Sequence, residues 1–388
     1  MREEVFVKIL IFGAGRMGMA AAWHMLRSPG IVGVTLADAD RSRLQMASRW
    51  LKDRRVAARV FDCAIPQSGT AARLMKGYRA ALSAVPYRFN LALSRAAIQA
   101  RVPFCDLGGN HDVVRAQCKL DGAARKKGVG IVPDCGVVPG LGSVLVAHGV
   151  KKLDSVEHIQ IRCGGIPQNP RPPLMYELFF SAGGLVNEYV EPSEIIRDGK
   201  LCQVESLTGI EEIVFPPPIG RLEAFYTSGG TSTLCETFLG RVQTLDDKTI
   251  RHPGHAEKMR ALAQLGLMSS KPLRVEGVSI RPRALLERLL EANLVGDGRD
   301  ILLLRVVVAG KKNGQPRTIT YEIIDWYDEK NRLTGMQRTT AFSGSIIAQM
   351  LARGEIGPGI HRQEISVPTD RFLAELGRSG ISCQETMS

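Results

Sequence analysis

The sequence predicts an α/β fold in two parts: an N-terminal parallel sheet covered by helices, then an α+β domain built on a largely antiparallel sheet. Three observations predict it. Strand patterns alternate with helical patterns over residues 7–132, a glycine-rich turn follows the first strand, and the alternation stops near Pro133. A chain of 388 residues is long enough for two domains with a core each.

The glycine-rich turn is the most informative local pattern. A strand over 7–12 and a helix over 16–27 flank it, and its cofactor-contacting residues are expected to be Gly13, Gly15, Arg16, Met17 and Gly18. In this arrangement the first glycine permits the tight turn, the second lets the backbone approach a pyrophosphate, and the third lets helix and strand pack closely. The pyrophosphate then sits on free N–H groups at the positive end of the helix dipole. The turn therefore predicts a dinucleotide-binding (Rossmann) domain.

A second predicted strand, over 33–37, ends in Asp38, twenty residues after the last glycine of the turn. A carboxylate at this position accepts hydrogen bonds from the ribose 2′-hydroxyl of an adenosine and repels a 2′-phosphate. The pattern therefore favours NAD as the cofactor. NADP stays an alternative, because arginines that could meet a 2′-phosphate lie nearby in the sequence: Arg16, Arg41 and Arg43.

The alternation of strands and helices continues to residue 132. Further strands are predicted near 56–61, 80–85, 102–106 and 129–132, with helices near 41–53, 68–76, 89–100 and 112–127. Six parallel strands fit the order 3-2-1-4-5-6 with right-handed crossovers. Because ligands of this fold cross the carboxyl ends of the strands, cofactor contacts are also expected from Asp62, Ser83, Val85, Pro86, Asp106, Gly108 and Gly109.

The fifth and sixth strand ends each allow two interpretations. Gly108 and Gly109 would let the backbone approach a nicotinamide ribose, but the same loop also fits a plain strand-to-helix turn with Asn110 as N-cap. Asp134 follows the sixth strand, where a carboxylate would lie beside the reacting carbon or merely cap a turn. Glycine and proline cluster over 133–142, which indicates a crossing into the second domain.

The second domain is predicted from antiparallel strand patterns. Two strands, 301–309 and 318–326, flank the hairpin-type loop 310–314. A third strand is predicted over 332–338, followed by a helix over 339–351.

Two polar clusters stand out in this domain. The first, 226–233, combines hydroxyl side chains with a glycine turn, an arrangement that suits an anionic group. The second contains Arg251, which could pair with a substrate carboxylate through two hydrogen bonds, and His255, which could accept a proton near neutral pH. A purely structural histidine is the alternative for His255.

Composition argues against other classes of function. The net charge of +12 is dispersed, without a long basic run interleaved with aromatic residues, so we expect no nucleic-acid partner. The eight cysteines show no zinc-ligand spacing, so we expect reduced thiols and no metal. There is no stretch of 18 uncharged apolar residues, and the N-terminus leads almost at once into the first strand, so we expect no membrane span, no signal peptide and a cytoplasmic protein.

The chain resembles the saccharopine dehydrogenase superfamily, and within it most closely the bacterial L-lysine 6-dehydrogenases. The segments that carry the resemblance run in the family's order over nearly the whole chain. They are FGAGRMG (12–18), VTLADAD (34–40), DLGGN (106–110), PDCGVVPG (133–140), GGIPQNPRPPLMYE (164–177), RLEAFYTSGGTSTL (221–234), KTIRHPGHAEKM (248–259), RTTAF (338–342) and AQMLARG (348–354). The first is generic, whereas those between 164 and 259 are specific.

The resemblance implies a domain organisation and a reaction. Residues 1–135 and a returning segment, 343–388, would form the dinucleotide-binding domain, and residues 136–342 the substrate domain. The implied activity is NAD-dependent oxidative deamination of the ε-amine of L-lysine to 2-aminoadipate 6-semialdehyde, with release of ammonia. The alternatives are oxidation of a secondary amine such as saccharopine or a carboxylated polyamine, and a non-catalytic NAD(H)-binding protein.

The same resemblance suggests roles for individual residues. A base or a dry pocket must help to neutralise the substrate ammonium, and the candidates for the base, in order, are His255, Asp134, Tyr176 and Glu177. Arg251, with Thr231 and Ser232, would hold the α-carboxylate, and Glu188 or Glu223 would face the α-ammonium. Arg88 near the nicotinamide end would favour a diacid substrate such as saccharopine if it faces the substrate. The substrate is expected to be a small amino acid, and the protein a homo-oligomer.

Overall fold

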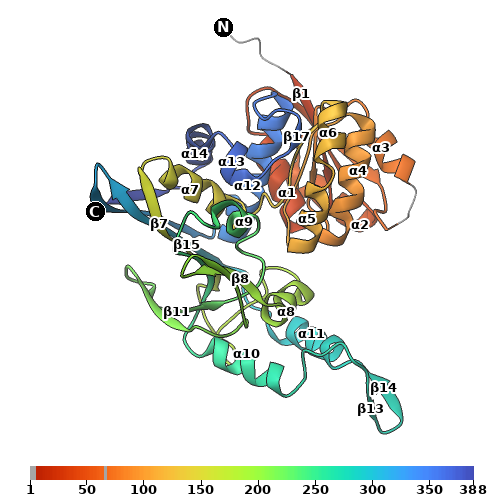
Figure 1. Ribbon diagram of the computed structural model, residues 1–388. Coiled ribbons are helices and arrows are strands. Elements are labelled where there is room, and N and C mark those ends of the chain that lie inside the picture. The colour runs from red at the N-terminus through yellow and green to blue at the C-terminus, as the bar shows by residue number, and fades with distance from the viewer. Residues whose placement is uncertain (1–5, 65–67) are drawn as a thin grey trace. The chain divides into compact units, whose positions relative to one another are not determined.

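The computed structural model describes residues 6–64 and 68–388, and the chain divides into two compact units (Figure 1). The first unit runs to His148 and resumes over Gln337–Ser382; the second comprises Gly149–Met336 and Cys383–Ser388. The chain therefore returns to the first unit near its C-terminus. Its last six residues belong to the second unit, because strand β18 (Gln384–Met387) pairs with the neighbouring strand β16 (Gln315–Trp326) of that unit's sheet.

The first unit contains a seven-stranded sheet in the order β17-β6-β5-β4-β1-β2-β3, and every pairing in it is parallel. This confirms the predicted dinucleotide-binding order. The short strand β17, from the returning segment, extends the sheet beside β6. The strands are β1 (Val7–Phe12), β2 (Ile31–Asp38), β3 (Val56–Val60), β4 (Ala80–Ser83), β5 (Phe104–Asp106), β6 (Gly130–Val132) and β17 (Gly359–Ile360).

Helices alternate with these strands, as the sequence predicts. They are α1 (Arg16–Met25), α2 (Arg41–Leu51), α3 (Ser68–Met75), the short 3₁₀ turn η1 (Tyr87–Phe89), α4 (Asn90–Ala100), α5 (His111–Cys118), α6 (Asp121–Lys127) and α7 (Leu141–Val150). The single helix predicted over 112–127 is wrong: α5 and α6 are separated by a turn in which the Leu120 N–H donates to the Gln117 carbonyl at 2.8 Å. Apolar strand residues such as Leu10 and Phe104 pack with α4 residues in one core.

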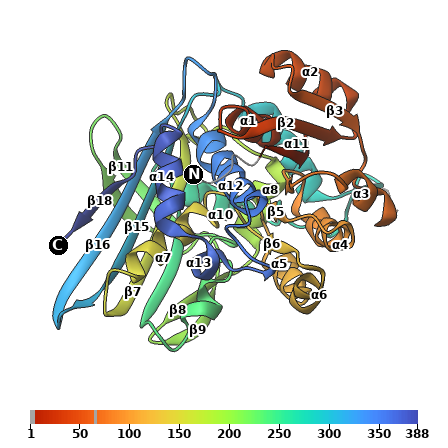
Figure 2. The same ribbon diagram turned by 90° about the horizontal axis from the view of Figure 1, so that it is seen from above.

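The second unit is built on a nine-stranded sheet whose main path is β10-β11-β12-β7-β15-β16-β18. Only the β12–β7 pair is parallel in this sheet, which confirms the largely antiparallel prediction. Figure 2 shows the long strands β15 and β16 side by side, with β18 along β16. The strands not yet bounded are β7 (Ser155–Pro167), β8 (Ser193–Arg197), β9 (Lys200–Val204), β10 (Glu211–Phe215), β11 (Gly220–Tyr226), β12 (Thr244–Arg251) and β15 (Asp300–Lys312).

Helices cover one face of this sheet and form a core there. They are α8 (Ala182–Val190), α9 (Leu234–Phe238), α10 (His255–Gln264) and α11 (Pro282–Asn293), and a separate hairpin is made of β13 (Leu273–Val275) and β14 (Val278–Ile280). Leu185 of α8, Met259 of α10 and Leu286 of α11 pack in one cluster with Phe225 of β11. The predicted hairpin of β15 and β16 turns more tightly than expected, since only Asn313 and Gly314 lie outside the strands.

The strand predicted over 332–338 is wrong, because helix α12 (Gly335–Ala352) begins there. The Asp300 carboxylate explains the early start. It accepts hydrogen bonds from the first two helical N–H groups, those of Gly335 at 2.6 Å and Met336 at 2.8 Å. Helix α12 enters the first unit and is followed by α13 (Gln363–Ser366) and α14 (Thr369–Arg378).

Candidate active site

The glycine turn of the first unit has the geometry that a dinucleotide requires. A Cβ on Gly13, which has a φ of +101°, would lie 2.7 Å from the Ala84 carbonyl oxygen, and one on Gly18 would lie 1.9 Å from the Gly13 oxygen. These two glycines are therefore needed for packing. A Cβ on Gly15 would meet nothing within 4 Å, so the backbone at the start of α1 is open to a close ligand such as a pyrophosphate.

Asp38, at the end of β2, is fixed by the backbone around it. One carboxylate oxygen accepts the Ala14 N–H at 2.8 Å, and the other accepts the Asp40 N–H at 2.9 Å. The carboxylate thereby joins the glycine turn to the end of β2, where an adenosine ribose binds in this fold. The three nearby arginines are exposed, and Arg43 is paired with Asp40 at 3.5 Å.

Two of the predicted cofactor contacts have side chains that are occupied by protein groups. The buried Ser83 hydroxyl donates to the Asn90 side chain at 2.7 Å. One oxygen of the buried Asp106 carboxylate accepts the Gly108 N–H at 2.9 Å and the Asp134 N–H at 3.2 Å, and the other accepts the Gln117 amide at 2.7 Å. Burial raises the pKa of Asp106 to about 6. These two side chains bind protein groups at the ends of β4 and β5, and so hold the loops that follow these strands.

The other predicted contacts at the strand ends retain exposed surface. Asp62, Val85 and Pro86 are partly or fully exposed, and the Asp62 carboxylate accepts the Ala64 N–H at 2.8 Å.

The Gly108–Gly109 loop lets the side chains of Asp134 and Tyr87 approach its backbone. A Cβ on Gly108 would lie 2.0 Å from an Asp134 carboxylate oxygen, and one on Gly109 would lie 3.2 Å from the Tyr87 ring. Both glycines have positive φ, +80° and +122°. Asn110 also caps α5, accepting the Val113 N–H at 3.1 Å. The strand-to-helix turn with Asn110 as N-cap is therefore confirmed, and the contact of this loop with a nicotinamide ribose stays a prediction.

Asp134 has an uncommon backbone conformation for a residue with a side chain. Its φ is +59°, and the side chain is buried. Its N–H donates to Asp106, and its carbonyl accepts a hydrogen bond from the Gln363 amide. Gln363 did not emerge from the sequence, because no local pattern reveals a partner that lies 229 residues away.

In the second unit, Arg251 is buried, and not all the hydrogen-bond donors of its guanidinium have a partner. One terminal nitrogen donates to the Ile250 carbonyl at 2.8 Å, and the other lies 4.0 Å from a Glu188 carboxylate oxygen. Its Nε has no hydrogen-bond partner among the described residues. The guanidinium carbon lies 4.6 Å from the centre of the Tyr176 ring. Burial acts to lower the Arg251 pKa, but Tyr189, Tyr176 and Glu188 outweigh it and raise the pKa, so the side chain stays charged.

His255 lies in the core beside this arginine, and protein groups occupy both of its ring nitrogens. Nδ1 is 3.0 Å from the Leu174 carbonyl, which can only accept, so Nδ1 carries the hydrogen. Nε2 then accepts the hydrogen bond of the Tyr189 hydroxyl at 2.9 Å. Burial and the charge of Arg251 lower the His255 pKa to about 3. A neutral and fully engaged imidazole does not favour the predicted role as a proton acceptor.

The other candidate bases of the second unit are also engaged. The Tyr176 ring lies 5.3 Å from the His255 ring, and burial raises the pKa of Tyr176 to about 12. Glu177 accepts the Gly298 N–H at 3.2 Å, and burial raises its pKa. Glu223, a candidate for the α-ammonium contact and not for the base, accepts the N–H groups of Gly254 at 2.8 Å and Ala256 at 2.7 Å, and so caps helix α10.

The hydroxyl-rich segment 226–233 packs against the sheet. Thr231 is buried and donates to the Glu194 carbonyl at 3.1 Å, while Ser232 has a φ of +42°. A Cβ on Gly230 would lie 1.9 Å from an Asp247 carboxylate oxygen. The segment therefore covers Asp247, whose pKa is raised to about 8 by burial.

Sequence reasoning missed Asp247, although a signal was present. In β12, Asp247, Thr249 and Arg251 occupy alternate positions, and alternate residues of a strand share one face of the sheet. This alternation of polar side chains is a signal that the sequence itself contains.

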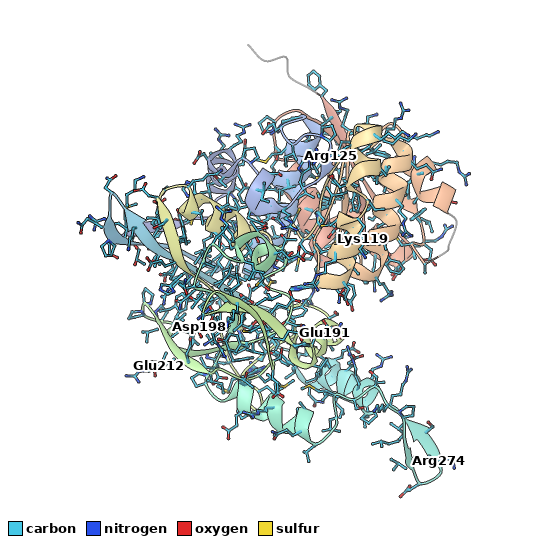
Figure 3. The ribbon with its side chains drawn as sticks, in the orientation of Figure 1. Lys119, Arg125, Glu191, Asp198, Glu212 and Arg274 are labelled. Atoms are coloured by element: carbon cyan, nitrogen blue, oxygen red, sulfur yellow. The ribbon has the colours of Figure 1, made fainter. Side chains whose placement is uncertain are left out.

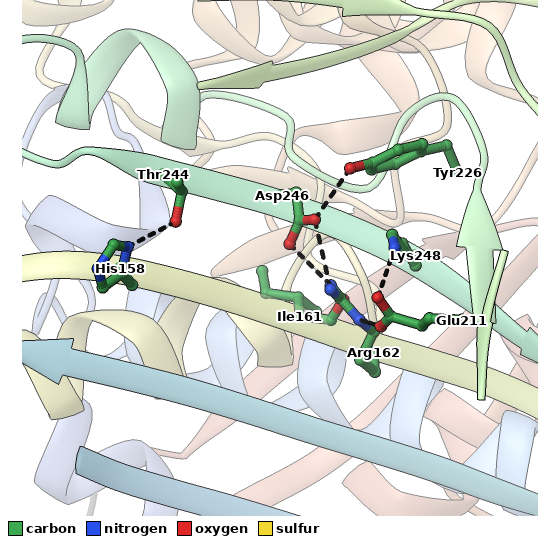
Figure 4. Close-up of polar contacts among 8 residues, drawn as sticks. All are labelled: His158, Ile161, Arg162, Glu211, Tyr226, Thr244, Asp246 and Lys248. Atoms are coloured by element: carbon green, nitrogen blue, oxygen red, sulfur yellow. Dashed lines mark hydrogen bonds and ion pairs between the residues drawn. The ribbon is translucent and has the colours of Figure 1, made fainter. Parts of the chain in front are cut away.

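The opposite face of the same strand carries an ion network, shown in Figure 4. The buried Arg162 binds both oxygens of Asp246, at 2.8 and 3.3 Å, and also pairs with Glu211. Lys248 donates to Glu211 at 2.5 Å, and the Tyr226 hydroxyl donates to Asp246 at 3.3 Å. Both cations are thus paired with carboxylates.

Arg88, in the first unit, is exposed, and its guanidinium lies 4.6 Å from the centre of the Phe89 ring.

Surface charge of both signs is spread along the chain. Figure 3 labels Lys119 and Arg125 in the first unit and Glu191, Asp198, Glu212 and Arg274 in the second. Within residues 6–64 and 68–388, no three His, Cys, Asp or Glu side chains are grouped so that they could hold a metal ion. No helix in that same part of the chain is long and apolar enough to cross a membrane.

Comparison with known proteins identifies relatives of this chain. Among curated proteins it is similar to the mitochondrial alpha-aminoadipic semialdehyde synthases of Rattus norvegicus (22% identity over 332 residues, 82% of this chain and 34% of the relative) and Mus musculus (23% over 304 residues, 75% and 31%). The chain thus spans about a third of the length of these relatives. Among solved structures, apo saccharopine dehydrogenase (L-Glu forming) from Saccharomyces cerevisiae has the same fold, with a TM-score of 0.79 at 18% identity over 98% of this chain and 100% of that chain.

Two family models match consecutive parts of the sequence. The saccharopine dehydrogenase NADP binding domain matches residues 9–132, and the saccharopine dehydrogenase C-terminal domain matches residues 136–381. Together with the glycine turn and the fixed carboxylate of Asp38, the first match establishes a nicotinamide dinucleotide as the cofactor. The second match covers more than half of the chain, which therefore belongs to the saccharopine dehydrogenase family of oxidoreductases.

Proposed function

We propose that this protein oxidises the ε-amine of L-lysine with NAD⁺ and water. Hydride transfer from the ε-carbon to NAD⁺ gives NADH and an imine, and water then hydrolyses the imine to 2-aminoadipate 6-semialdehyde and ammonia. The observation that carries the proposal is the buried guanidinium of Arg251, which keeps an unpartnered Nε and lies beside the Glu188 carboxyl group. A cation and an anion at this separation complement the carboxylate and the ammonium of one α-amino acid.

Arg251 is assigned to the substrate α-carboxylate. A planar guanidinium binds a carboxylate through two parallel hydrogen bonds, and such charge-assisted bonds are strong where water is excluded. Arg251 is 3% exposed, and the Tyr176 ring beneath it limits its movement. His255 and Tyr189 support the site as a neutral, hydrogen-bonded pair beside that ring.

Glu188 is assigned to the α-ammonium group of the substrate. Its side chain keeps about 35% of its surface accessible, unlike that of Arg251. Burial raises the pKa of Glu188 to about 7, although Arg251 acts in the opposite direction. A substrate ammonium beside this carboxyl group would favour its ionised form. Glu223, the other candidate, is occupied by the cap of α10.

The distribution of cations favours lysine over a substrate with an additional acid arm. Among the described residues of the second unit, the buried cations Arg162 and Lys248 are bound tightly by Glu211 and Asp246, whereas Arg251 has only Glu188, at 4.0 Å, as a carboxylate partner. Arg88 stacks on its neighbour Phe89 at the surface and so adds no support for a diacid.

Asp38 favours NAD over NADP. Its carboxylate is fixed by two backbone N–H groups at the end of β2. A carboxylate held there accepts a ribose 2′-hydroxyl and repels a 2′-phosphate.

The reaction also needs a proton acceptor, for which we now favour Asp134. An amine loses a hydride only when it is neutral, and an ordinary lysine ammonium has a pKa near 10.4. The nicotinamide of the bound cofactor supplies the hydride acceptor. Asp134 lies against Gly108 at the carboxyl end of β6, in the half of the sheet that binds the nicotinamide half of a dinucleotide. His255 and Glu177 are engaged by hydrogen bonds in the second unit, and burial raises the pKa of Tyr176 to about 12.

Saccharopine, or a related secondary amine, is the second candidate substrate. It is favoured by the likeness of the whole chain to a saccharopine dehydrogenase in fold and by the family models. For this substrate the same C–N bond chemistry would apply, with the amino acid head again bound by Arg251.

The test is formation of NADH, followed by its absorbance, when the purified protein is mixed with NAD⁺ and either L-lysine or saccharopine at mildly alkaline pH. We expect turnover with lysine and release of one ammonia for each NADH. Turnover with saccharopine alone would replace the first candidate by the second. Binding of NADH without turnover of either amine would contradict both.

A further inference from the structure

The conformation of Asp134 requires support from other residues. A φ of +59° is uncommon for a residue other than glycine, because the Cβ crowds the adjacent carbonyl. Such a backbone persists only where surrounding groups hold it. Here the N–H of Asp134 donates to the Asp106 carboxylate at 3.2 Å, and its carbonyl accepts from the Gln363 side chain.

Gln363 contributes two hydrogen bonds to this short stretch of chain. It begins helix α13 in the returning C-terminal segment and is 4% exposed. Its amide nitrogen donates to the Pro133 carbonyl at 3.0 Å and to the Asp134 carbonyl that follows it. The amide therefore holds two consecutive peptide groups directly after β6.

These bonds are not needed to attach the returning segment to the first unit. Backbone pairing of β17 with β6 already attaches it: the Gly359 N–H donates to Val129 at 2.9 Å, and the His361 N–H donates to Ile131 at 2.8 Å. The Ile360 N–H donates to the Asp121 carboxylate at 2.8 Å. A role limited to docking would be redundant.

The held conformation determines where the Asp134 side chain lies. Its carboxylate rests where a Cβ of Gly108 would be, 2.0 Å from that ideal position. The Asp106 oxygen that accepts the Asp134 N–H also accepts the Gly108 N–H. Gln363, Asp134 and the Gly108–Gly109 loop are therefore coupled through direct contacts, and that loop lies at the nicotinamide half of the sheet.

We propose that Gln363 is a positioning residue: by fixing the backbone of Asp134, it directs the Asp134 carboxylate to the Gly108–Gly109 loop and so shapes the nicotinamide end of the cofactor site. In this way the returning segment completes the dinucleotide site. The effect on turnover rests on the proposed function, whereas the effect on cofactor binding does not.

The test compares two variants with a matched control. Gln363→Leu removes the donors, and Gln363→Glu keeps the shape but replaces the donor amide by an acid. The control is Gln349→Leu, since Gln349 is also 4% exposed in the first unit but bonds to Ser345 of its own helix and to Arg353 just after it. Two ligands are titrated by fluorescence or calorimetry: NADH, and ADP-ribose, which lacks the nicotinamide.

We expect Gln363→Leu to weaken NADH binding about tenfold while ADP-ribose binding changes less than about twofold, and to lower kcat about ten- to a hundredfold. The kcat of Gln363→Glu should fall further as pH rises. A protonated acid can donate to one carbonyl, an ionised acid to none, and the carboxylates of Asp106 and Asp134 oppose its ionisation. The wild type has no acid at position 363, so its kcat should not show this additional decrease with pH.

Two results would overturn the proposal. One is equal weakening of NADH and ADP-ribose, together with a loss of thermal stability like that of Gln349→Leu, which would show a general structural role. The other is unchanged NADH affinity in Gln363→Leu. If the wild type oxidises neither amine, the proposed function fails, but the comparison of NADH with ADP-ribose still decides the role of Gln363.

Discussion

The buried histidine of the second unit leads to a quantitative prediction about stability. His255 has an ordinary pKa of 6.5, and burial lowers it to about 3 in the folded protein. Between these two values the unfolded chain binds a proton that the folded chain does not. The neutral form of His255 therefore makes its full contribution to the free energy of unfolding above pH 6.5. As pH falls, the free energy of unfolding decreases by about 1.4 kcal/mol for each pH unit, down to the pKa of the folded protein. At pH 5 the loss from His255 is about 2 kcal/mol.

The perturbation that isolates this effect is His255→Gln. A glutamine amide can donate to the Leu174 carbonyl and accept from the Tyr189 hydroxyl, as the neutral imidazole does, but it does not titrate. We therefore expect the variant to lose about 2 kcal/mol less than the wild type between pH 7.5 and pH 5. Its stability at pH 7.5 falls only by the packing difference between the two side chains.

The assay is urea unfolding at both pH values, followed by fluorescence of Trp326, which lies on β16 of the second unit. The chain has three tryptophans, so Trp23 and Trp50 are replaced by phenylalanine in every sample. His24→Gln is the control: burial lowers the His24 pKa to about 4, but His24 lies in the first unit. The reasoning would be refuted if the free energy of unfolding depended on pH equally in the wild type and in His255→Gln. His255 would then take up its proton with nearly the same pKa in the folded and in the unfolded chain.

Further predictions address the cofactor, the substrate, one helix cap and the assembly. Arg251→Leu should raise the KM for L-lysine about a hundredfold by removing a charge-assisted bond, whereas Arg221→Leu, at an exposed arginine of the same sheet, should leave steady-state kinetics unchanged. Asp38→Ser should shift the ratio of kcat/KM values from NAD⁺ toward NADP⁺ about tenfold or more, because the repulsion of a 2′-phosphate is lost. Glu223→Leu should lower the free energy of unfolding by about 1–3 kcal/mol, measured with urea, because the N–H groups that begin α10 lose their acceptor. Sedimentation equilibrium should give a homo-oligomer, and a monomer at all concentrations would contradict that prediction.

Local patterns in the sequence determined much of the first unit. A Rossmann turn depends on residues that are adjacent in the chain, so Gly13, Gly15 and Gly18 could be assigned from their spacing, and each has the backbone surroundings expected of it. The alternation of strands and helices likewise predicted the parallel sheet and its order. The antiparallel character of the second sheet followed from the paired strands around Gly314.

Roles in the candidate site were harder to predict, because the partners come from distant parts of the chain. The segment around Arg251 and His255 was recognised in the sequence as a polar cluster. Its chemistry depends on Tyr189 and Leu174, which engage both nitrogens of His255 and turn an apparent base into a buried neutral group. Asp247 was not predicted as a site residue. Its place among the alternating polar residues of β12 can be read from the sequence, but its burial under Gly230 is a property of the folded sheet.

Only the tertiary structure determined where helices α10 and α12 begin and how the backbone of Asp134 is held. Asp300 starts α12 and Glu223 starts α10, each from a strand that is remote in sequence. Gln363 fixes the backbone of Asp134 in the same manner. Residue spacing encodes backbone turns and the period of a strand or helix, because these depend on neighbours. Hydrogen-bond partners and pKa values depend on which groups the fold brings together and removes from water, and the spacing along one chain does not contain that information.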